Sequence, residues 1–486
     1  MKQDVAEALK QIDTRAWKKI SLEYGSDRLE VAVPRDSFEV GMGKVPHIDD
    51  VRSEIERAFS NPIGTLRLEE IVDQKGKEPK EMTASVTVSD ITRPVPYKGE
   101  KGILAPILQK LESAGLQKKN IKIIVGTGMH RPSTYDEKVE MFGKEVVGQY
   151  TILDHDCQNN DLLASIGKSR RGTHVYVNRD FYFSDLKIAT GLVESHFMTG
   201  VSGGRKSICP GLVDVKTIQR FHGPRYLEDP NATNFILEGN PCHEEALEVA
   251  KTVGVDFIVN ATLDKDMHLT RVFAGDLVEA HMEAYTMIKD YAEIPLDEQF
   301  DIVLTHGGYV GRDHYQTAKS GVGALPAVKE GGVIIIAANN RDKEPIGSPE
   351  YKTLLHLLKL QGTDGYLDLL KHSCWGFTKD QWEPEVWGKV LRKVGSDGLI
   401  YCSGEIARED YYTIPGTSGY EFLPRIRSGA GADGTAHKSN LEKVQTMVQN
   451  ALVHSVFRLR QKNREPSVCY IQEGPYAIPT YRKPSY

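Results

Sequence analysis

The sequence predicts an α/β protein with two α/β domains, whose sheets are substantially parallel and whose active site lies in an interdomain cleft. Short runs rich in β-branched residues recur along the chain, and each ends in glycine or a polar turn. Amphipathic segments separate many of these runs, which is typical of parallel strands covered by helices. The length of 486 residues also exceeds the size at which one hydrophobic core usually stops growing.

The expected elements alternate along the chain. The first 20 residues form an amphipathic pattern that indicates a surface helix packed on the first domain. The polar, proline-containing stretch 292–301 separates a helical pattern from a new buried strand, so we expect domains at 1–295 and 296–486. The tail after residue 428 could return to the first domain. The expected strands are 84–88, 121–128, 186–192, 301–308, 331–339 and 398–404, and the clearest helices are 103–116, 241–254 and 278–292.

Composition favours a small-molecule ligand over a nucleic acid or a membrane. Lysine and arginine total 61 against 67 acidic residues, a formal net charge of -6, so no global basic field attracts polyanions. The six cysteines include no CxxC pair, which in a chain of this size indicates reduced thiols and a cytoplasmic protein. No apolar run approaches membrane-spanning length, and the amino-terminal residues do not resemble a signal peptide.

Polar side chains follow four of the expected strands, at the point where each strand ends. In open α/β sheets, ligands bind beyond the carboxyl ends of the strands, so these side chains could converge on one cleft. The two cations among them, Arg93 and Lys319, could bind a carboxylate or a phosphate, and the guanidinium of an arginine can do so with two parallel hydrogen bonds. The residues in this position are Asp90, Arg93, His130, His196, Gln316 and Lys319.

The octapeptide "GVSGGRKS" surrounds Lys206 with glycines. It nearly matches the phosphate-binding loop G-x-x-x-x-G-K-[ST], but the glycine required before the lysine is Arg205. A lysine in such a loop could serve as a point charge, or as a nucleophile that forms a covalent link. A tight turn with a solvated lysine is the structural alternative.

The histidines allow three chemical interpretations besides an ordinary structural hydrogen bond. His130 and His196 could move protons on opposite sides of one carbon, which would permit inversion of its configuration. Together with His222 they could instead form a three-histidine zinc site, although the chain lacks an HExxH motif. A single imidazole could also bind a nickel or copper ion whose other donors come from elsewhere.

Five motifs in this order resemble the lactate racemase family, whose enzymes use a nickel-pincer nucleotide. They are "SDITRPVP", "GTGMHR", "ESHFMTGVSGGRKSICPG", "RFHGP" and "YQTAK", and they cover about Asp90 to Lys319. The resemblance implies a Ni(II)-pyridinium-3,5-bisthiocarboxylate mononucleotide, joined as a thioamide to Lys206. Nickel would be held by the ring carbon, both sulfurs and His222. On this interpretation the glycines beside Lys206 make room for the cofactor.

The resemblance also implies a role for each remaining site residue. One histidine would take the hydroxyl proton of a 2-hydroxy acid while the C2 hydride moves to the cofactor, and the other would reprotonate the oxygen after the hydride returns to the opposite face. The implied roles are catalysis by His130 and His196, cofactor binding by Asp90, Ile91, Thr92, Arg93 and Tyr315, and substrate binding by Arg93, Gln316 and Lys319.

The substrate is predicted only as a class. The stretch 371–418 is rich in polar and aromatic residues, which suits a hydroxyl-rich acid such as D-gluconate, because each buried hydroxyl needs a partner. Lactate or malate racemization is the alternative within the family, and a non-catalytic protein that stores nickel or the cofactor is the alternative outside it. The expected partners are the 2-hydroxy acid and the enzymes that make the cofactor.

Overall fold

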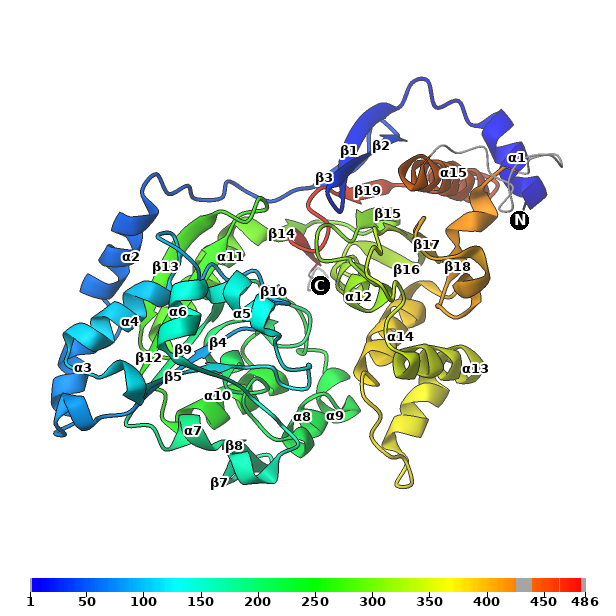
Figure 1. The fold of residues 1–486 in the computed structure, drawn as a ribbon. Helices are drawn as coiled ribbons and strands as arrows, with labels where there is room; N and C mark the ends of the chain where they lie inside the picture. Colours follow the sequence, from blue (N-terminus) through cyan, green and yellow to red (C-terminus); the bar gives the residue numbers. More distant parts are fainter. Residues whose placement is uncertain (1, 425–438, 463, 482–486) are drawn as a thin grey trace. The chain divides into compact units, whose positions relative to one another are not determined.

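A computed structural model describes residues 2–424, 439–462 and 464–481 (Figure 1). The chain forms two compact units. The first unit is Lys44–Tyr291, and the second unit combines Met1–Gly43 with Ala292–Tyr486. The sequence placed a boundary at 295 and assigned the first 43 residues to the first domain. The structure instead groups those residues with the second half of the chain.

The unit Lys44–Tyr291 contains a six-stranded sheet in the order β13-β12-β9-β4-β5-β6. All neighbouring strands are parallel except β12 and β13, which form an antiparallel hairpin. The predicted α/β class with mostly parallel sheets is therefore confirmed for this unit. The strands are β4 (Ala84–Val88), β5 (Ile121–Val125), β6 (Thr151–Asp154), β9 (Leu186–Leu192), β12 (Phe257–Leu263) and β13 (Leu269–Gly275).

Helices and short hairpins surround this sheet (Figure 1). Several helices begin at a side chain that accepts hydrogen bonds from the first free backbone amides, as Asp214 does for α8 and Asn240 for α10. The helices are α2 (Val51–Ser60), α3 (Leu68–Gln74), α4 (Leu104–Ser113), α5 (Tyr135–Phe142), α6 (Lys144–Gln149), α7 (Arg179–Tyr182), α8 (Val215–Phe221), α9 (Pro224–Leu227), α10 (Pro241–Val253) and α11 (Glu279–Ala292). The hairpins pair β7 (Leu163–Lys168) with β8 (His174–Asn178) and β10 (Ser195–His196) with β11 (Gly200–Val201).

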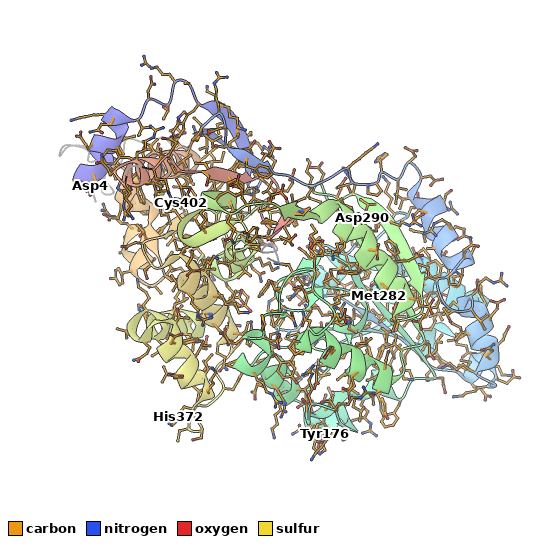
Figure 2. All side chains as sticks on the ribbon, turned by 180° about the vertical axis from the view of Figure 1, so that it is seen from behind. Asp4, Tyr176, Met282, Asp290, His372 and Cys402 are labelled. Atoms are coloured by element: carbon orange, nitrogen blue, oxygen red, sulfur yellow. The ribbon has the colours of Figure 1, made fainter. Side chains whose placement is uncertain are left out.

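Helix α11 shows how one helix separates a solvent face from a buried face. Met282 and Asp290, both labelled in Figure 2, are exposed, whereas His281 is buried. A shallow groove of about 590 Å³ runs along this exposed side, between α11 and β13, and none of the predicted site residues line it.

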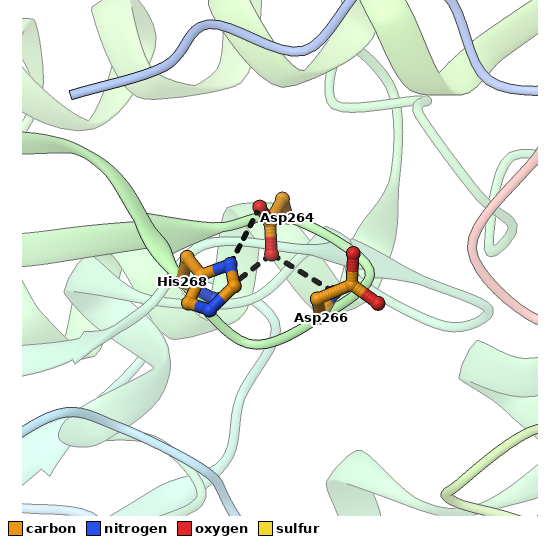
Figure 3. A group of neighbouring side chains, drawn as sticks. All are labelled: Asp264, Asp266 and His268. Atoms are coloured by element: carbon orange, nitrogen blue, oxygen red, sulfur yellow. Dashed lines mark hydrogen bonds and ion pairs between the residues drawn. The ribbon is translucent and has the colours of Figure 1, made fainter. Parts of the chain in front are cut away.

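The turn between β12 and β13 holds three side chains with oxygen or nitrogen ligand atoms, Asp264, Asp266 and His268 (Figure 3). One Asp264 oxygen accepts hydrogen bonds from the backbone amides of the other two residues at 2.9 and 2.8 Å. These bonds close the turn, and Lys265 pairs with the Asp266 carboxylate.

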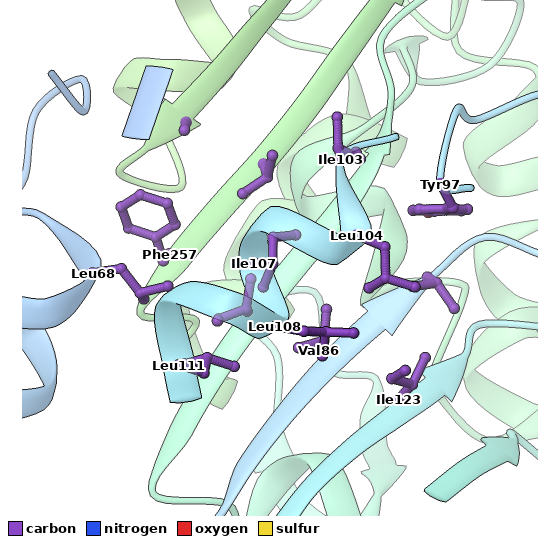
Figure 4. Packing of buried hydrophobic residues seen from close by; sticks show 14 of the residues in the cluster. Leu68, Val86, Tyr97, Ile103, Leu104, Ile107, Leu108, Leu111, Ile123 and Phe257 are labelled. Carbon is purple, nitrogen blue, oxygen red and sulfur yellow. The ribbon is translucent and has the colours of Figure 1, made fainter. Parts of the chain in front are cut away.

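The core of this unit lies between the sheet and α4 (Figure 4). Every residue of β4 is buried, as expected for a central parallel strand with helices on both faces. Helix α4 turns Leu104, Ile107, Leu108 and Leu111 toward that strand, with the spacing of one helical face. Burial of each such side chain contributes about 1.5–3 kcal/mol, so α4 fixes the sheet firmly.

The second unit is built on a parallel sheet in the order β18-β17-β16-β15-β19-β3. Strand β3 comes from the start of the chain and pairs with β19 near its end, which explains why the first 43 residues belong here. Strand β20 pairs with β14, so the described part of the tail stays in this unit; residues 482–486 lie outside the described residues. The sheet strands are β3 (Phe38–Val40), β15 (Phe300–His306), β16 (Val328–Ala337), β17 (Leu399–Cys402), β18 (Thr417–Ser418) and β19 (Val468–Ile471).

The remaining elements of the second unit cover this sheet or extend it. The expected amino-terminal helix is shorter than predicted, because α1 ends at Gln11 and the chain then forms a β-hairpin. Among helices of the described residues, none combines the length and apolar character needed to cross a bilayer. The elements are α1 (Lys2–Gln11), β1 (Lys18–Tyr24), β2 (Asp27–Val33), β14 (Glu293–Leu296), α12 (His314–Gly323), α13 (Pro349–Lys371), α14 (Trp382–Val394), α15 (Asn440–Arg460) and β20 (Ile478–Tyr481).

Candidate active site

Asp90 and His130 form a carboxylate–imidazole pair at the carboxyl ends of the adjacent strands β4 and β5. The Asp90 Oδ2 atom lies 2.5 Å from His130 Nδ1, and its Oδ1 atom accepts hydrogen bonds from the Thr92 amide and hydroxyl at 3.1 and 2.6 Å. Burial favours the protonated acid, but the hydrogen bonds from His130 and Thr92 outweigh it and lower the pKa of Asp90. The ionised carboxylate therefore keeps a proton on Nδ1 of His130 and leaves Nε2 able to accept another.

Arg93 and Glu194 form an ion pair at the same edge of the sheet, with Nη1 and Oε1 2.6 Å apart. About a quarter of each side chain is exposed. The guanidinium has five N–H donors, and this pair uses Nη1, so the planar group is oriented while its other donors can address a ligand. Ile91, between Asp90 and Thr92, is exposed. Thr92, which was also predicted to bind the cofactor, donates both its amide and its hydroxyl hydrogen bonds to Asp90 in this structure.

His196 lies in the hairpin of β10 and β11 that follows β9, and it is buried. Its Nδ1 atom accepts hydrogen bonds from the backbone amides of Met198 and Thr199 at 3.2 and 3.4 Å. Because an amide N–H can only donate, Nδ1 is unprotonated and the proton of the neutral ring is on Nε2. The ring also stacks on Phe197, with 5.0 Å between the centroids. His130 and His196 therefore carry their protons on different ring nitrogens.

The loop before Lys206 uses its glycines for backbone conformation and close packing. Gly203 and Gly204 have φ angles of 75° and 49°, which side chains rarely allow. A Cβ atom on Gly203 would lie 2.7 Å from a Val193 methyl, and one on Gly204 would lie 3.0 Å from the His281 ring. Protein atoms therefore lie on the side of both glycines where a side chain would be, and the room that these glycines are expected to make for a cofactor stays a prediction. Lys206 itself is half-buried in the short helix Gly204–Ser207.

His222 ends helix α8 and has the protonation state of a metal ligand. Its Nδ1 atom donates to the carbonyl oxygen of Ile218 at 3.0 Å, which leaves the lone pair on Nε2. Burial lowers the pKa of His222 to about 4, with smaller contributions from the charges of Lys206 and His130. The imidazole is therefore neutral at pH 7, and the Lys206 cation lies within electrostatic range of it.

Tyr315, Gln316 and Lys319 lie on α12 of the second unit. The backbone amide of Gln316 donates to Asp313 at 2.6 Å, so this carboxylate caps the helix. Burial raises the pKa of Asp313 to about 6. The Tyr315 hydroxyl accepts a hydrogen bond from Trp382 at 2.8 Å.

The structure does not support the three-histidine zinc alternative. Within the described residues, His130, His196 and His222 do not bring their ring nitrogens within 4.8 Å of one another. The group that meets this criterion is the turn of Asp264, Asp266 and His268, which follows β12 and contains none of these three histidines. A metal at His222 would thus need donors that these two histidines do not supply.

Comparison with known proteins decides which family has this arrangement. Residues 24–234 match the family model described as the lactate racemase N-terminal domain. The chain is 35% identical over 289 residues to a lactate racemase of Lactiplantibacillus plantarum, covering 59% of this chain and 66% of that protein. A lactate racemase of Thermoanaerobacterium thermosaccharolyticum is 29% identical over 395 residues, covering 76% of this chain and 85% of the relative.

The fold agrees with these matches. The lactate racemase apoprotein of Thermoanaerobacterium thermosaccharolyticum superposes with a TM-score of 0.77 at 25% identity, covering 96% of this chain and 100% of that one. This chain belongs to the lactate racemase family. It is accordingly an isomerase of the racemase class. A Thermotoga maritima protein, 14% identical with a TM-score of 0.62 over 90% of this chain and all of that one, shares the fold.

Two residues of this lactate racemase family member were not predicted as part of its site. Glu194 pairs with Arg93, and its place one residue before the "SH" of His196 was the available signal. Arg205 is fully buried beside Lys206, whereas the sequence suggested only a failed phosphate-loop motif. Charged residues are rarely buried, so nothing in the sequence pattern indicated that this arginine is internal.

Proposed function

We propose that the protein inverts C2 of a 2-hydroxy acid with the nickel-pincer nucleotide of the lactate racemase family. The observation that carries this proposal is the difference in tautomer between His130 and His196, because Nε2 of His130 offers a lone pair and Nε2 of His196 offers an N–H group to a substrate hydroxyl. The two relatives described above are named lactate racemases, and racemases of this family act on small hydroxy acids.

The residues present fit the proposed cofactor. His222 is a neutral imidazole with its lone pair on Nε2, which is the form that binds nickel. Lys206 lies within electrostatic range of that ring and would carry the covalent link, made with the help of the enzymes that synthesise the cofactor. The chemistry that the cofactor supplies when bound is reversible acceptance of a hydride from C2. We therefore assign metal ligation to His222 and attachment to Lys206.

His130 is the proton acceptor in this proposal. Its Nε2 atom takes the substrate hydroxyl proton, and the ionised Asp90 stabilises the resulting imidazolium through Nδ1. The substrate carboxylate binds the Arg93 donors that Glu194 leaves available. The family resemblance supports substrate binding by Gln316 and Lys319 and cofactor binding by Tyr315.

His196 acts on the substrate oxygen through its Nε2–H group. For full proton transfer it must first be doubly protonated, and a proton on Nδ1 would oppose the amides of Met198 and Thr199. In the described conformation His196 therefore holds the oxygen by a hydrogen bond, and complete transfer requires those amides to turn away. This distinguishes its role from that of His130.

For the substrate we propose a hydroxyl-rich acid such as D-gluconate, with lactate and malate as the alternatives. Two polar segments of the stretch 371–418, residues 373–382 and 404–413, are candidates for hydroxyl recognition. Segment 404–413 uses polar groups within the protein, because Glu405 accepts from Tyr24 and the Tyr411 hydroxyl bonds both backbone groups of Ser403. Segment 373–382 instead ends at Trp382, which contacts Tyr315 on the helix that carries Lys319. Gln381 in this segment already accepts hydrogen bonds from Trp375 and the Thr378 amide, so the contact of Trp382 with Tyr315 is what favours this segment for hydroxyl recognition.

One experiment tests this proposal. Protein produced together with the cofactor-synthesis enzymes is incubated with single stereoisomers of gluconate, malate, phenyllactate and lactate, and the products are resolved by chiral chromatography. We expect inversion at C2, fastest for gluconate. If lactate is clearly fastest, the sugar-acid proposal is wrong and the reaction class stands. If cofactor is bound but no acid is inverted, the protein is a cofactor store.

The covalent link gives a separate prediction. Intact mass spectrometry of the same preparation should show an adduct on the wild-type chain, and Lys206→Ala should lack it, because the thioamide requires a primary amine. His222→Ala should keep the adduct but lose nickel, measured by elemental analysis, because this imidazole is assigned as a ligand. An adduct on Lys206→Ala would refute the attachment site.

A further inference from the structure

The Arg205 guanidinium is buried in the unit Lys44–Tyr291, with only 1% of the residue exposed. No carboxylate of the described chain pairs with it, and burial lowers its pKa to about 9, so it remains charged at neutral pH. Burying a charge without a counter-ion costs stability. A buried arginine of this kind is therefore expected to have a specific structural role. The hydrogen-bond partners of the guanidinium indicate what that role is.

Four of its hydrogen bonds go to consecutive parts of one loop. Nη2 donates to the carbonyl oxygens of Thr199 and Val201 at 3.0 and 2.8 Å. Nη1 lies 3.2 Å from the carbonyl oxygens of both Ser202 and Gly203. These carbonyls span the end of the hairpin that carries His196 and the glycines that lead to Lys206. One side chain therefore organises the whole connection.

Two further contacts attach this loop to the helices behind it. Nε donates to His243 Nδ1 on α10 at 3.0 Å, and Nη1 lies 2.5 Å from His281 Nε2 on α11. Since arginine has only donors, Nδ1 of His243 must accept. Nε2 of His281 also lies 2.9 Å from the carbonyl oxygen of Ser202, to which it can only donate, so its contact with Nη1 is a close approach of the ring to the guanidinium. Burial and the charge of Arg205 lower the pKa of His243 to about 3 and that of His281 well below its usual value, so both rings are neutral.

Thr199 connects Arg205 to the ring nitrogen that sets the tautomer of His196. The carbonyl oxygen of Thr199 accepts from Arg205, and its amide donates to Nδ1 of His196. On the other side, the amide of Lys206 donates to the Gly203 carbonyl at 3.0 Å, the same oxygen that faces Arg205. The two reactive side chains thus share one buried support.

We propose that Arg205 is a positioning residue that holds His196 in its Nε2–H tautomer and Lys206 in its attachment geometry. This inference rests on the proposed function of those two residues. The planar fork of an arginine can reach acceptors in several directions at fixed angles, whereas a lysine offers three donors from one atom. Arg205→Lys should therefore keep the positive charge but lose most of the hydrogen bonds to the loop carbonyls.

The first measurement uses the protein without cofactor. Nitrogen-15 spectra of labelled histidine report which ring nitrogen of His196 is protonated, and the His196→Gln spectrum assigns the signals. We expect Nε2–H in the wild type and a mixture of tautomers in Arg205→Lys, with amide hydrogen exchange over 198–206 faster by about tenfold or more. Arg57→Lys is the matched control, because Arg57 also donates to a backbone carbonyl, that of Val272, but is remote from the loop. Wild-type ring signals and exchange in Arg205→Lys would overturn the proposal.

A second variant and a second readout keep the test decisive. If Arg205→Lys does not fold, His243→Ala removes one anchor at a half-buried position, and exchange over the same amides should rise by a smaller factor. Unchanged exchange would count against the proposal. With cofactor-synthesis enzymes present, the Lys206 adduct should fall about tenfold in Arg205→Lys. Absence of an adduct in the wild type would refute the proposed function instead, while the exchange data would still decide the role of Arg205.

Discussion

Replacing Asp90 with asparagine is expected to lower kcat by about 10²- to 10⁴-fold, because the neutral amide no longer fixes the proton of His130 on Nδ1 or stabilises its imidazolium. The 2.5 Å contact between Oδ2 and Nδ1 is the basis of this expectation. Binding of nickel and cofactor should persist, since His222 and Lys206 are unchanged. Steady-state kinetics of cofactor-loaded protein, normalised to the adduct content measured by mass spectrometry, would give the ratio.

Asp256→Asn is the matched control for this change. Asp256 also pairs with a cation, Lys75 at 2.6 Å, and accepts the Lys187 amide at the opposite end of the parallel strands. The same chemical change there should leave kcat within about twofold of the wild type, because exposed or partly exposed pairs contribute little and this pair is remote from the chemistry. Equal activity of Asp90→Asn and wild type would show that His130 does not need its partner.

Acid is expected to destabilise the unit that contains residues 2–43 and 292–481 from about pH 6.5 downward, so that the loss begins before ordinary carboxylates titrate. Burial lowers the pKa of His306 to about 4 and that of His314 to about 3, from 6.5 in the unfolded chain. The unfolded state therefore binds more protons, so this stability is fully present above pH 6.5 and is lost as pH falls from 6.5 toward 3. Each pH unit in that window costs about 1.4 kcal/mol per histidine, or roughly 5 kcal/mol for both at pH 4.5.

His314→Phe isolates one of the two contributions. The phenylalanine can keep the stacking on Trp387, where the ring centroids are now 4.6 Å apart, but it cannot titrate. The loss of unfolding free energy between pH 7 and 4.5 should shrink by about half, although the hydrogen bond to Tyr351 is lost at every pH. Urea unfolding followed by tryptophan fluorescence reports this unit alone, because the four tryptophans, residues 17, 375, 382 and 387, all belong to it.

The exposed His372, labelled in Figure 2, provides the control. His372→Gln should show the wild-type dependence of stability on pH, because His372 is exposed and is not part of the buried contacts of His306 and His314. The expectation for His314 would be wrong if His314→Phe lost stability between pH 7 and 4.5 as steeply as the wild type does.

Strong local patterns were sufficient to predict the central elements of each sheet. The stretches 84–88 and 186–192 coincide with β4 and β9, because a buried parallel strand needs an uninterrupted apolar run. Helix α4 was predicted to within a few residues from its apolar face. Strand β3 was not predicted, because it is three residues long and its partner β19 is more than 400 residues away in the sequence.

The site was predicted as a set of residues but not as a set of contacts. Placement after the strands identified Asp90, His130 and His196, since parallel topology brings those positions to one edge. Which ring nitrogen carries each proton depends on partners such as the Thr199 amide, and a tertiary contact of this kind leaves no periodic signal. Arg205 was missed for the same reason, because its acceptors are backbone carbonyls that any sequence would supply.

The pairing of β3 with β19 sets an order for folding during synthesis. When all of Lys44–Tyr291 has left the ribosome, at least four of the six strands in the sheet of the second unit have not yet been released. Strand β19 is synthesised near the end of the chain. At roughly 5–20 residues per second, translation from Ala292 to β19 takes on the order of 10–40 s, far longer than most domains need to fold. The unit that carries His130, His196 and Lys206 can therefore fold first. During that time β3 has no partner, because β19 has not yet been synthesised. During that interval residues 2–43 are accessible to chaperones and proteases. A mutation that weakens the pairing of β19 with β3 would prolong this accessibility without changing the catalytic residues.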